Sequence, residues 1–67
     1  MNWFAHHRQD WIGDMLYVYG FINREHITRK FDVSVPQASN DIRRYLLDHP
    51  GTVVYNMTAK RYERVTP

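Results

Sequence analysis

The first third of the chain carries apolar residues at helical spacing. Those positions are Trp11, Ile12, Met15, Leu16 and Tyr19. This period is typical of an amphipathic helix that buries one face, and it predicts a helix over residues 5–19. Gly20 is expected to end the helix, because glycine readily adopts the left-handed conformation that closes helices. Gly13 is a poor helix former within the stretch, so it is expected to mark a place of close packing.

A two-residue strand and a two-turn helix are predicted next. Residues 21–22 (Phe-Ile) are long enough only for a stub of strand. Asn23 is a good N-cap, so the second helix is predicted over residues 24–31. Ile27 and Phe31 stand four residues apart and form its buried face. A helix this short depends on tertiary packing for its stability.

The third helix has the best-specified start in the chain. Ser34 is its predicted N-cap, and Pro36 then takes the second helical position, where a missing N–H loses no hydrogen bond. The Ser34 hydroxyl is therefore expected to accept a hydrogen bond from the N–H of Gln37. The Gln37 side chain can reach back to the Ser34 N–H and complete a capping box. Val33 is expected to pack on Ala38 as a hydrophobic staple.

This helix, which is expected to end at His49-Pro50-Gly51, has two different faces. The buried face consists of Ala38, Ile42, Tyr45 and Leu46. The opposite face consists of Gln37, Asn40 and Arg44, flanked by Pro36 and Arg43. Gln, Asn and Arg side chains can hydrogen-bond the edges of bases, whereas a helix that only had to be soluble would favour Glu, Lys and Ala.

A β-hairpin is predicted after the third helix. Residues 52–55 are β-branched and aromatic, residues 56–59 form a turn, and residues 60–65 return with Tyr62 facing the core. The order helix, stub strand, helix, helix, hairpin predicts an α+β fold of the winged helix-turn-helix type. In that fold the stub strand joins the hairpin in a small antiparallel sheet, and the third helix presents its N-terminal face to a major groove of DNA.

Length and charge narrow the possibilities further. The chain is expected to form a single domain, residues 1–67. Its net charge is +2, and all of the excess lies in residues 34–67, which hold five Lys or Arg against three Asp or Glu. This mild basic bias is compatible with nucleic acid as a partner. No apolar run is long enough for a signal peptide or a membrane span, so a cytoplasmic protein is expected.

Neither a catalytic site nor a metal site is expected. The sequence has no Cys, and His6 and His7 are adjacent, so on a helix their rings point about 100° apart. No suitably spaced carboxylate completes a ligand set. No nucleophile stands beside a base and an orienting acid, and there is no glycine-rich phosphate loop. We therefore expect no enzyme and no cofactor.

Several sequence blocks run as one series across residues 8–62. They are Arg8-x-x-Trp11-Ile12, Met15-Leu16-Tyr17-x-Tyr19-Gly20-x-Ile22-Asn23-Arg24, Val33-Ser34-Val35-Pro36-Gln37-Ala38-Ser39-x-Asp41-x-x-Arg44-Tyr45, Pro50-Gly51 and Ala59-Lys60-x-Tyr62. In these blocks the chain resembles the N-terminal winged-helix domain of WYL-domain transcriptional regulators, in particular the repressors of bacterial phage-defence operons (the CapW and BrxR type).

The resemblance implies a dimeric repressor that binds an inverted repeat in its own promoter. Regulators of this type continue into a WYL domain thought to sense a ligand. Residues 1–67 contain nothing of that domain, so the resemblance implies no effector ligand for this chain. The chain is expected to be either a piece of a longer regulator or a stand-alone DNA-binding protein.

Nine residues are candidate contacts to double-stranded DNA. They are Ser34, Gln37, Ser39, Asn40, Arg43, Arg44, Thr58, Lys60 and Arg61. Ser34 lies at the positive end of the third helix, where its hydroxyl or N–H would meet a phosphate. Ser39 and Asn40 have no capping role and are expected to contact bases or phosphates. The last three residues lie at or beside the hairpin tip, where a wing touches the phosphate backbone.

Three of these residues have competing roles. Gln37 either reads adenine or completes the capping box, because one amide cannot fully do both. Arg43 and Arg44 contact phosphate or guanine, or else form only a charged face. Arg44 has the further alternative of an ion pair with Asp41 or Asp48.

Two other functions stay open from the residues alone. A winged helix can act as a protein-interaction module, although such a role would favour apolar residues on the exposed face of the third helix. Binding of single-stranded DNA or RNA would need exposed aromatic residues, for which only Tyr17 and Tyr55 are candidates. Trp3 and Phe4 precede the predicted first helix and are expected either to cover the core or to contact a partner subunit.

Overall fold

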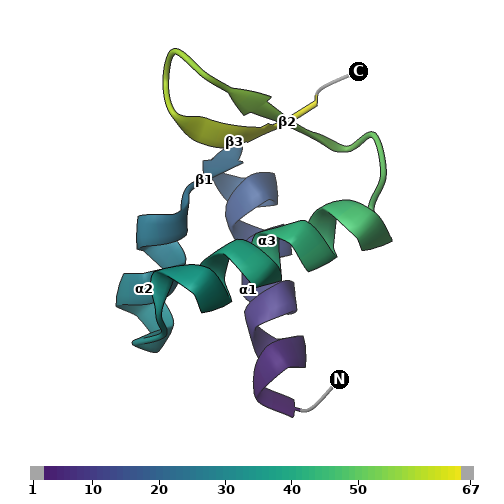
Figure 1. The fold of residues 1–67 in the computed structure, drawn as a ribbon. Helices are drawn as coiled ribbons and strands as arrows, with labels where there is room; N and C mark the ends of the chain where they lie inside the picture. Colours follow the sequence, from purple (N-terminus) through teal and green to yellow (C-terminus); the bar gives the residue numbers. More distant parts are fainter. Residues whose placement is uncertain (1–2, 66–67) are drawn as a thin grey trace.

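The computed structural model describes residues 3–65 and confirms the expected order of elements. They are α1 (Trp3–Val18), β1 (Phe21–Ile22), α2 (Arg24–Phe31), α3 (Val35–Asp48), β2 (Val53–Asn56) and β3 (Arg61–Arg64). In Figure 1, α3 crosses α1, α2 lies beside the start of α3, and the sheet covers the end of α1 from which the chain enters β1. The fold is a winged helix, in which β2 and β3 form the wing.

Helix α1 begins earlier than the apolar pattern predicted. Trp3 and Phe4 are its first residues, so the expectation that they precede the helix is wrong. Both side chains are about two-thirds exposed, at 69% and 67%, and they do not cover the core. The ring of Trp3 stacks on that of His7, with centroids 5.2 Å apart, because residues four apart share one face of a helix.

Helix α2 is capped by the side chain of Asn23 at its start and by the left-handed backbone of Asp32 at its end. Asn23 Oδ1 accepts a hydrogen bond from the N–H of His26, and the Asn23 N–H donates to His26 Nδ1. The two bonds form a reciprocal capping box with His26 as the third helical residue. Asp32 ends the helix in the left-handed conformation, with φ of 54°. The predicted N-cap is confirmed.

Helix α3 starts as predicted, with one difference. Ser34 Oγ accepts from the N–H of Gln37 at 3.2 Å, and the Ser34 carbonyl accepts from the N–H of Ala38 at 2.9 Å. The capping box expected from Gln37 is wrong, because the Gln37 amide donates to Asp41 Oδ1 at 3.0 Å instead. Because the carboxylate is a charged acceptor, its hydrogen bond to the amide is stronger than the neutral bond that Gln37 Oε1 would form with the Ser34 N–H.

The sheet has the order β1-β3-β2, with both pairs antiparallel. Tyr62 in the central strand stands opposite Ile22 on one side and Tyr55 on the other. The wing turn is closed by Asn56, whose Oδ1 accepts from the N–H of Ala59 at 2.9 Å. Lys60, the last residue of that turn, has a left-handed backbone with φ of 56°.

The core lies where the three helices meet the inner face of the sheet. Its fully buried members are Ile12, Leu16, Ile22, Ile27, Ala38 and Ile42. The partly buried residues packed around them are Trp11, Met15, Phe31, Val33, Tyr45, Leu46, Val53 and Tyr62. Every residue predicted for the buried face of α3 is in one of these two sets. The helix therefore turns its opposite face to solvent.

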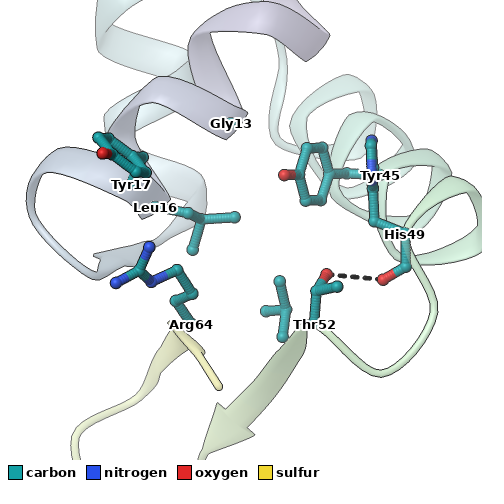
Figure 2. Close-up of a pocket in the computed structure, with 8 residues that line it drawn as sticks. Gly13, Leu16, Tyr17, Tyr45, His49, Thr52 and Arg64 are labelled. Atoms are coloured by element: carbon teal, nitrogen blue, oxygen red, sulfur yellow. Dashed lines mark hydrogen bonds between the residues drawn. The ribbon is translucent and has the colours of Figure 1, made fainter. Parts of the chain in front are cut away.

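Gly13 faces Tyr45 across a hollow of about 190 Å³ between α1, α3 and the sheet (Figure 2). A Cβ atom built at Gly13 would lie 3.5 Å from Tyr45 Oη, which is ordinary van der Waals contact. The expectation of close packing at Gly13 is therefore wrong, since the site has room for a methyl group. Desolvation by the surrounding side chains raises the pKa of the Tyr45 phenol.

Candidate nucleic-acid interface

The exposed face of α3 carries the central part of the predicted site. Asn40 and Arg43 lie on it one turn apart, and both are exposed. Neither makes a hydrogen bond or ion pair with another side chain among residues 3–65. Ser34 is also exposed, at the N-terminus of the same helix. The side chains of Asn40 and Arg43, which have no partner within the described residues, are therefore available to bind an external ligand.

Both acidic residues of α3 are neutralised by arginines. Arg44 Nε donates to Asp48 Oδ2 at 3.0 Å, which settles the alternative between Asp41 and Asp48. Asp41 is only 5% exposed and pairs with Arg8 of α1. Because each carboxylate has a guanidinium partner, Arg43 leaves the outer face of α3 with a net positive charge.

The pair between Arg8 and Asp41 joins α1 to α3. Arg8 Nε and Nη2 lie 2.7 Å and 3.2 Å from the two oxygens of the Asp41 carboxylate, and Gln9 Nε2 donates to the Asp41 carbonyl at 2.7 Å. Our sequence analysis missed this contact. The signal was the position of Asp41, three residues after Ala38 and four before Tyr45, on the face predicted to be buried. Nothing in the sequence pointed to Arg8 as its partner.

Gln37 and Ser39 are half-buried and already hydrogen-bonded. Gln37 Nε2 donates to Asp41, and Arg24 Nη1 donates to Ser39 Oγ at 3.3 Å. Each residue keeps other hydrogen-bonding capacity, because an amide has a carbonyl and a second N–H, and a hydroxyl has a donor and a second lone pair. Both side chains are therefore held in position by these hydrogen bonds and can still form others with DNA.

Arg24, which our sequence analysis did not select, brings the start of α2 to this surface. Together with Lys60 it lines an open hollow of about 250 Å³ between α2 and the wing. Its guanidinium binds the neutral hydroxyl of Ser39 and has no acidic partner within residues 3–65. The signal that could have revealed it is its place directly after the N-cap Asn23, in the helix-turn-helix unit.

The wing places its three predicted residues in different settings. Thr58 and Lys60 are exposed in the turn. The Arg61 guanidinium lies on the outer face of the sheet, where its Nε donates to Glu63 Oε2 at 2.7 Å and its Cζ is 4.3 Å from the centroid of Phe21. The hydrogen bond from Arg61, followed by the one from Asn56, lowers the pKa of Glu63. Arg61 is thus held by the sheet, while Thr58 and Lys60 at the tip have no side-chain partner among residues 3–65.

The described residues form neither a metal site nor a membrane-spanning helix. No three His, Asp or Glu side chains within residues 3–65 converge closely enough to hold a metal ion. In the same part of the chain, no helix has the length and apolar character needed to span a bilayer.

The comparisons with known proteins agree with this geometry. The family model of the BrxR transcriptional regulator winged helix-turn-helix domain matches residues 5–66, which include all three helices except the first two residues of α1. No curated protein matches the chain. Because the match spans nearly the whole sequence, the chain belongs to the BrxR-type winged helix-turn-helix domains of transcriptional regulators.

Proposed function

We propose that this domain is the sequence-specific DNA-binding part of a transcriptional repressor that acts in the cytoplasm on double-stranded DNA. Membership of a regulator's winged-helix family makes DNA binding and transcription regulation its general role and separates it from enzyme families. The observation that carries the finer proposal is the state of α3. Its acidic residues are paired, while Asn40 and Arg43 are exposed and have no side-chain partner in the part of the chain that the structure describes.

The proposed roles follow from position on the fold. Gln37 and Asn40, in the N-terminal half of α3, would meet base edges in the major groove. The remaining candidates on α3 would lie nearer the sugar–phosphate backbone of the DNA. They are Ser34, Ser39, Arg43 and Arg44. On the wing, Thr58, Lys60 and Arg61 would contact phosphates of the adjacent DNA backbone. Arg24 would contact phosphates there from the start of α2.

The proposed assembly is a homodimer on an inverted repeat, in an operon of the phage-defence kind that the family resemblance implies. A single module buries only about 600–1,000 Å² of protein surface on DNA, so one half-site supports modest affinity. Two copies on half-sites one helical turn apart double the contacts. Trp3 and Phe4, exposed at the start of α1, are the apolar surface that we expect to take part in pairing.

Selection from a library of randomised duplexes tests the proposal directly. The 67-residue chain should enrich a palindromic sequence, and sedimentation on that duplex should give two chains per site. Asn40→Ala should weaken binding to the selected duplex by about 1–3 kcal/mol and leave binding to random duplexes unchanged. A tight complex of one chain on a non-palindromic site would contradict the dimer, and no enrichment at all would contradict sequence-specific binding.

The protein-interaction module is the alternative, and the exposed apolar residues of α3 are relevant to it. Val35 and Leu47 are 56% and 71% exposed, near the two ends of the helix. The face between them is polar and basic. If the chain enriched no duplex, these two ends would become the surface to test against protein partners.

A further inference from the structure

The Gln37 side chain has a fixed orientation before any DNA is present. Its Nε2 lies 3.0 Å from Asp41 Oδ1. An ionised carboxylate can only accept hydrogen bonds, so the amide must turn its NH₂ group toward Asp41 and its carbonyl Oε1 away from it. A glutamine without such a neighbour could present either end of its amide to a ligand.

The carboxylate that sets this orientation is itself immobilised. The Asp41 side chain is 6% exposed, and that of Arg8 is 14% exposed. Arg8 donates to both Asp41 oxygens, and Gln9 donates to the backbone carbonyl of the same residue. The position of the Gln37 amide is therefore tied to α1 through Asp41, across the body of the domain.

We propose that Asp41, held by Arg8, is a positioning residue that presets the Gln37 amide to recognise adenine in the major groove. This inference rests on the proposed function and adds a base preference to it. One N–H of the amide is given to Asp41, and the other N–H and Oε1 remain. These two groups form a donor and an acceptor side by side.

Adenine is the base that matches this pair. Its major-groove edge offers N7 as acceptor and the N6 amino group as donor, so both free groups of the amide are satisfied at once. Guanine offers two acceptors, N7 and O6, and would place one of them against Oε1. Cytosine and thymine each match one of the two groups only. Fixing the amide beforehand also reduces the side-chain entropy lost on binding.

The competing explanation is that Gln37 only fills a remaining lone pair of Asp41. On that explanation the orientation of the amide only stabilises the Arg8–Asp41 pair and does not affect which base is bound. The two explanations differ in one measurable quantity, which is the base preference at the position that depends on Gln37.

The experiment selects duplexes from a randomised library with four forms of the chain. They are the wild type, Gln37→Ala, the double variant Arg8→Met with Asp41→Leu, and the combination of all three changes. Removing both partners of the buried pair avoids leaving an unpaired charge behind, so we expect the double variant to fold where a single removal would be strongly destabilising. A control with Glu25→Leu and Arg29→Met removes an exposed ion pair on α2 that does not touch Gln37.

The expected result is specific to one base pair. Wild type should prefer adenine at the Gln37-dependent position by about 5- to 160-fold, which is the range for one bidentate contact. The double variant should lose that preference while keeping the preference that Asn40 confers, and it should add nothing in the Gln37→Ala background. The control should keep both preferences. Full adenine preference in the folded double variant, or a preferred base other than adenine in wild type, would overturn the inference.

A second measurement needs no substitution and covers the case of a double variant that does not fold. NMR relaxation of the side-chain amides in the free wild-type chain should show the Gln37 NH₂ group more ordered than that of Asn40, which is exposed. Equal mobility of the two groups would overturn the inference. If wild type enriched no duplex, the proposed function would fail and the base preference with it. A retained sequence preference without dependence on Asp41 would defeat only the inference.

Discussion

Lys60 combines an unfavourable left-handed backbone with an exposed charge, and replacing it by glycine removes both. Its φ of 56° is left-handed, a conformation that costs a residue with a Cβ atom about 1–2 kcal/mol. Glycine removes this strain but loses about 0.4–1 kcal/mol through its more flexible unfolded chain. Lys60→Gly should therefore leave the stability unchanged or raise it by up to about 1.6 kcal/mol.

The same substitution should weaken DNA binding in a salt-dependent way. One lost phosphate contact reduces the slope of log K against log salt by about 0.9. Between 50 and 200 mM salt, wild type should therefore lose about 3.5-fold more affinity than Lys60→Gly does. Fluorescence anisotropy with a labelled duplex over this range measures the slope, and thermal unfolding followed by circular dichroism measures the stability.

Lys60→Arg is the matched control, because it keeps both the charge and the strained backbone. Its slope should equal that of wild type. If Lys60→Gly kept the wild-type slope as well, the wing would not touch phosphate. If Lys60→Gly lowered the stability, the left-handed backbone would not be a source of strain. The first result would refute the link between this residue and DNA, and the second would refute the reasoning about its backbone.

Further predictions concern stability, each measured by thermal or urea unfolding. Ser34→Ala should cost about 1 kcal/mol and lower Tm by several degrees, because the N-cap bond to Gln37 is lost; an unchanged Tm would contradict the capping geometry. Ile42→Ala should cost about 2–5 kcal/mol, and an unaffected variant would place that side chain outside the core. Gly13→Ala should stabilise the domain by about 0.5–1 kcal/mol, because the added Cβ atom would meet Tyr45 only at ordinary contact distance; a destabilised variant would contradict this. Since the pKa of Glu63 is lowered in the folded state, its contribution is present above the unfolded pKa and is lost as the pH falls through the folded pKa; Glu63→Gln should therefore be less sensitive to acid than wild type.

The elements of this fold could be predicted because short-range signals specify each of them. Asn23 and Ser34 begin their helices where the sequence placed them, since a cap is a contact between residues three positions apart. The spacing of Ala38 and Ile42 gave the buried face of α3 for a similar reason. The start of α1 was predicted two residues too late, because Trp3 and Phe4 extend the helix without entering the core.

The details of the candidate site depended on contacts between distant parts of the chain. The partner of Asp41 lies on another helix, so no local pattern could identify Arg8. That contact also decided the state of Gln37, which was predicted to cap its own helix. Arg61 similarly looked like a free basic residue until the sheet brought Phe21 beneath its guanidinium. Local sequence signals thus gave the positions of the polar residues, while tertiary contacts determined which of their atoms are free.

The central position of β3 has a consequence for how the chain folds. Strand β1 has only two residues, and within the described residues it pairs only with β3, so its hydrogen bonds stay unmade until β3 lies beside it. The loop closed by this pairing contains α2, α3 and β2, and closing so long a loop is entropically costly and slow. Packing of α2 against α3, which follow each other in the sequence, is more local and can precede it. On the ribosome, Ile22 therefore stays without its strand partner until Tyr62 has left the exit tunnel, and sheet closure is the step that we expect to set the folding rate.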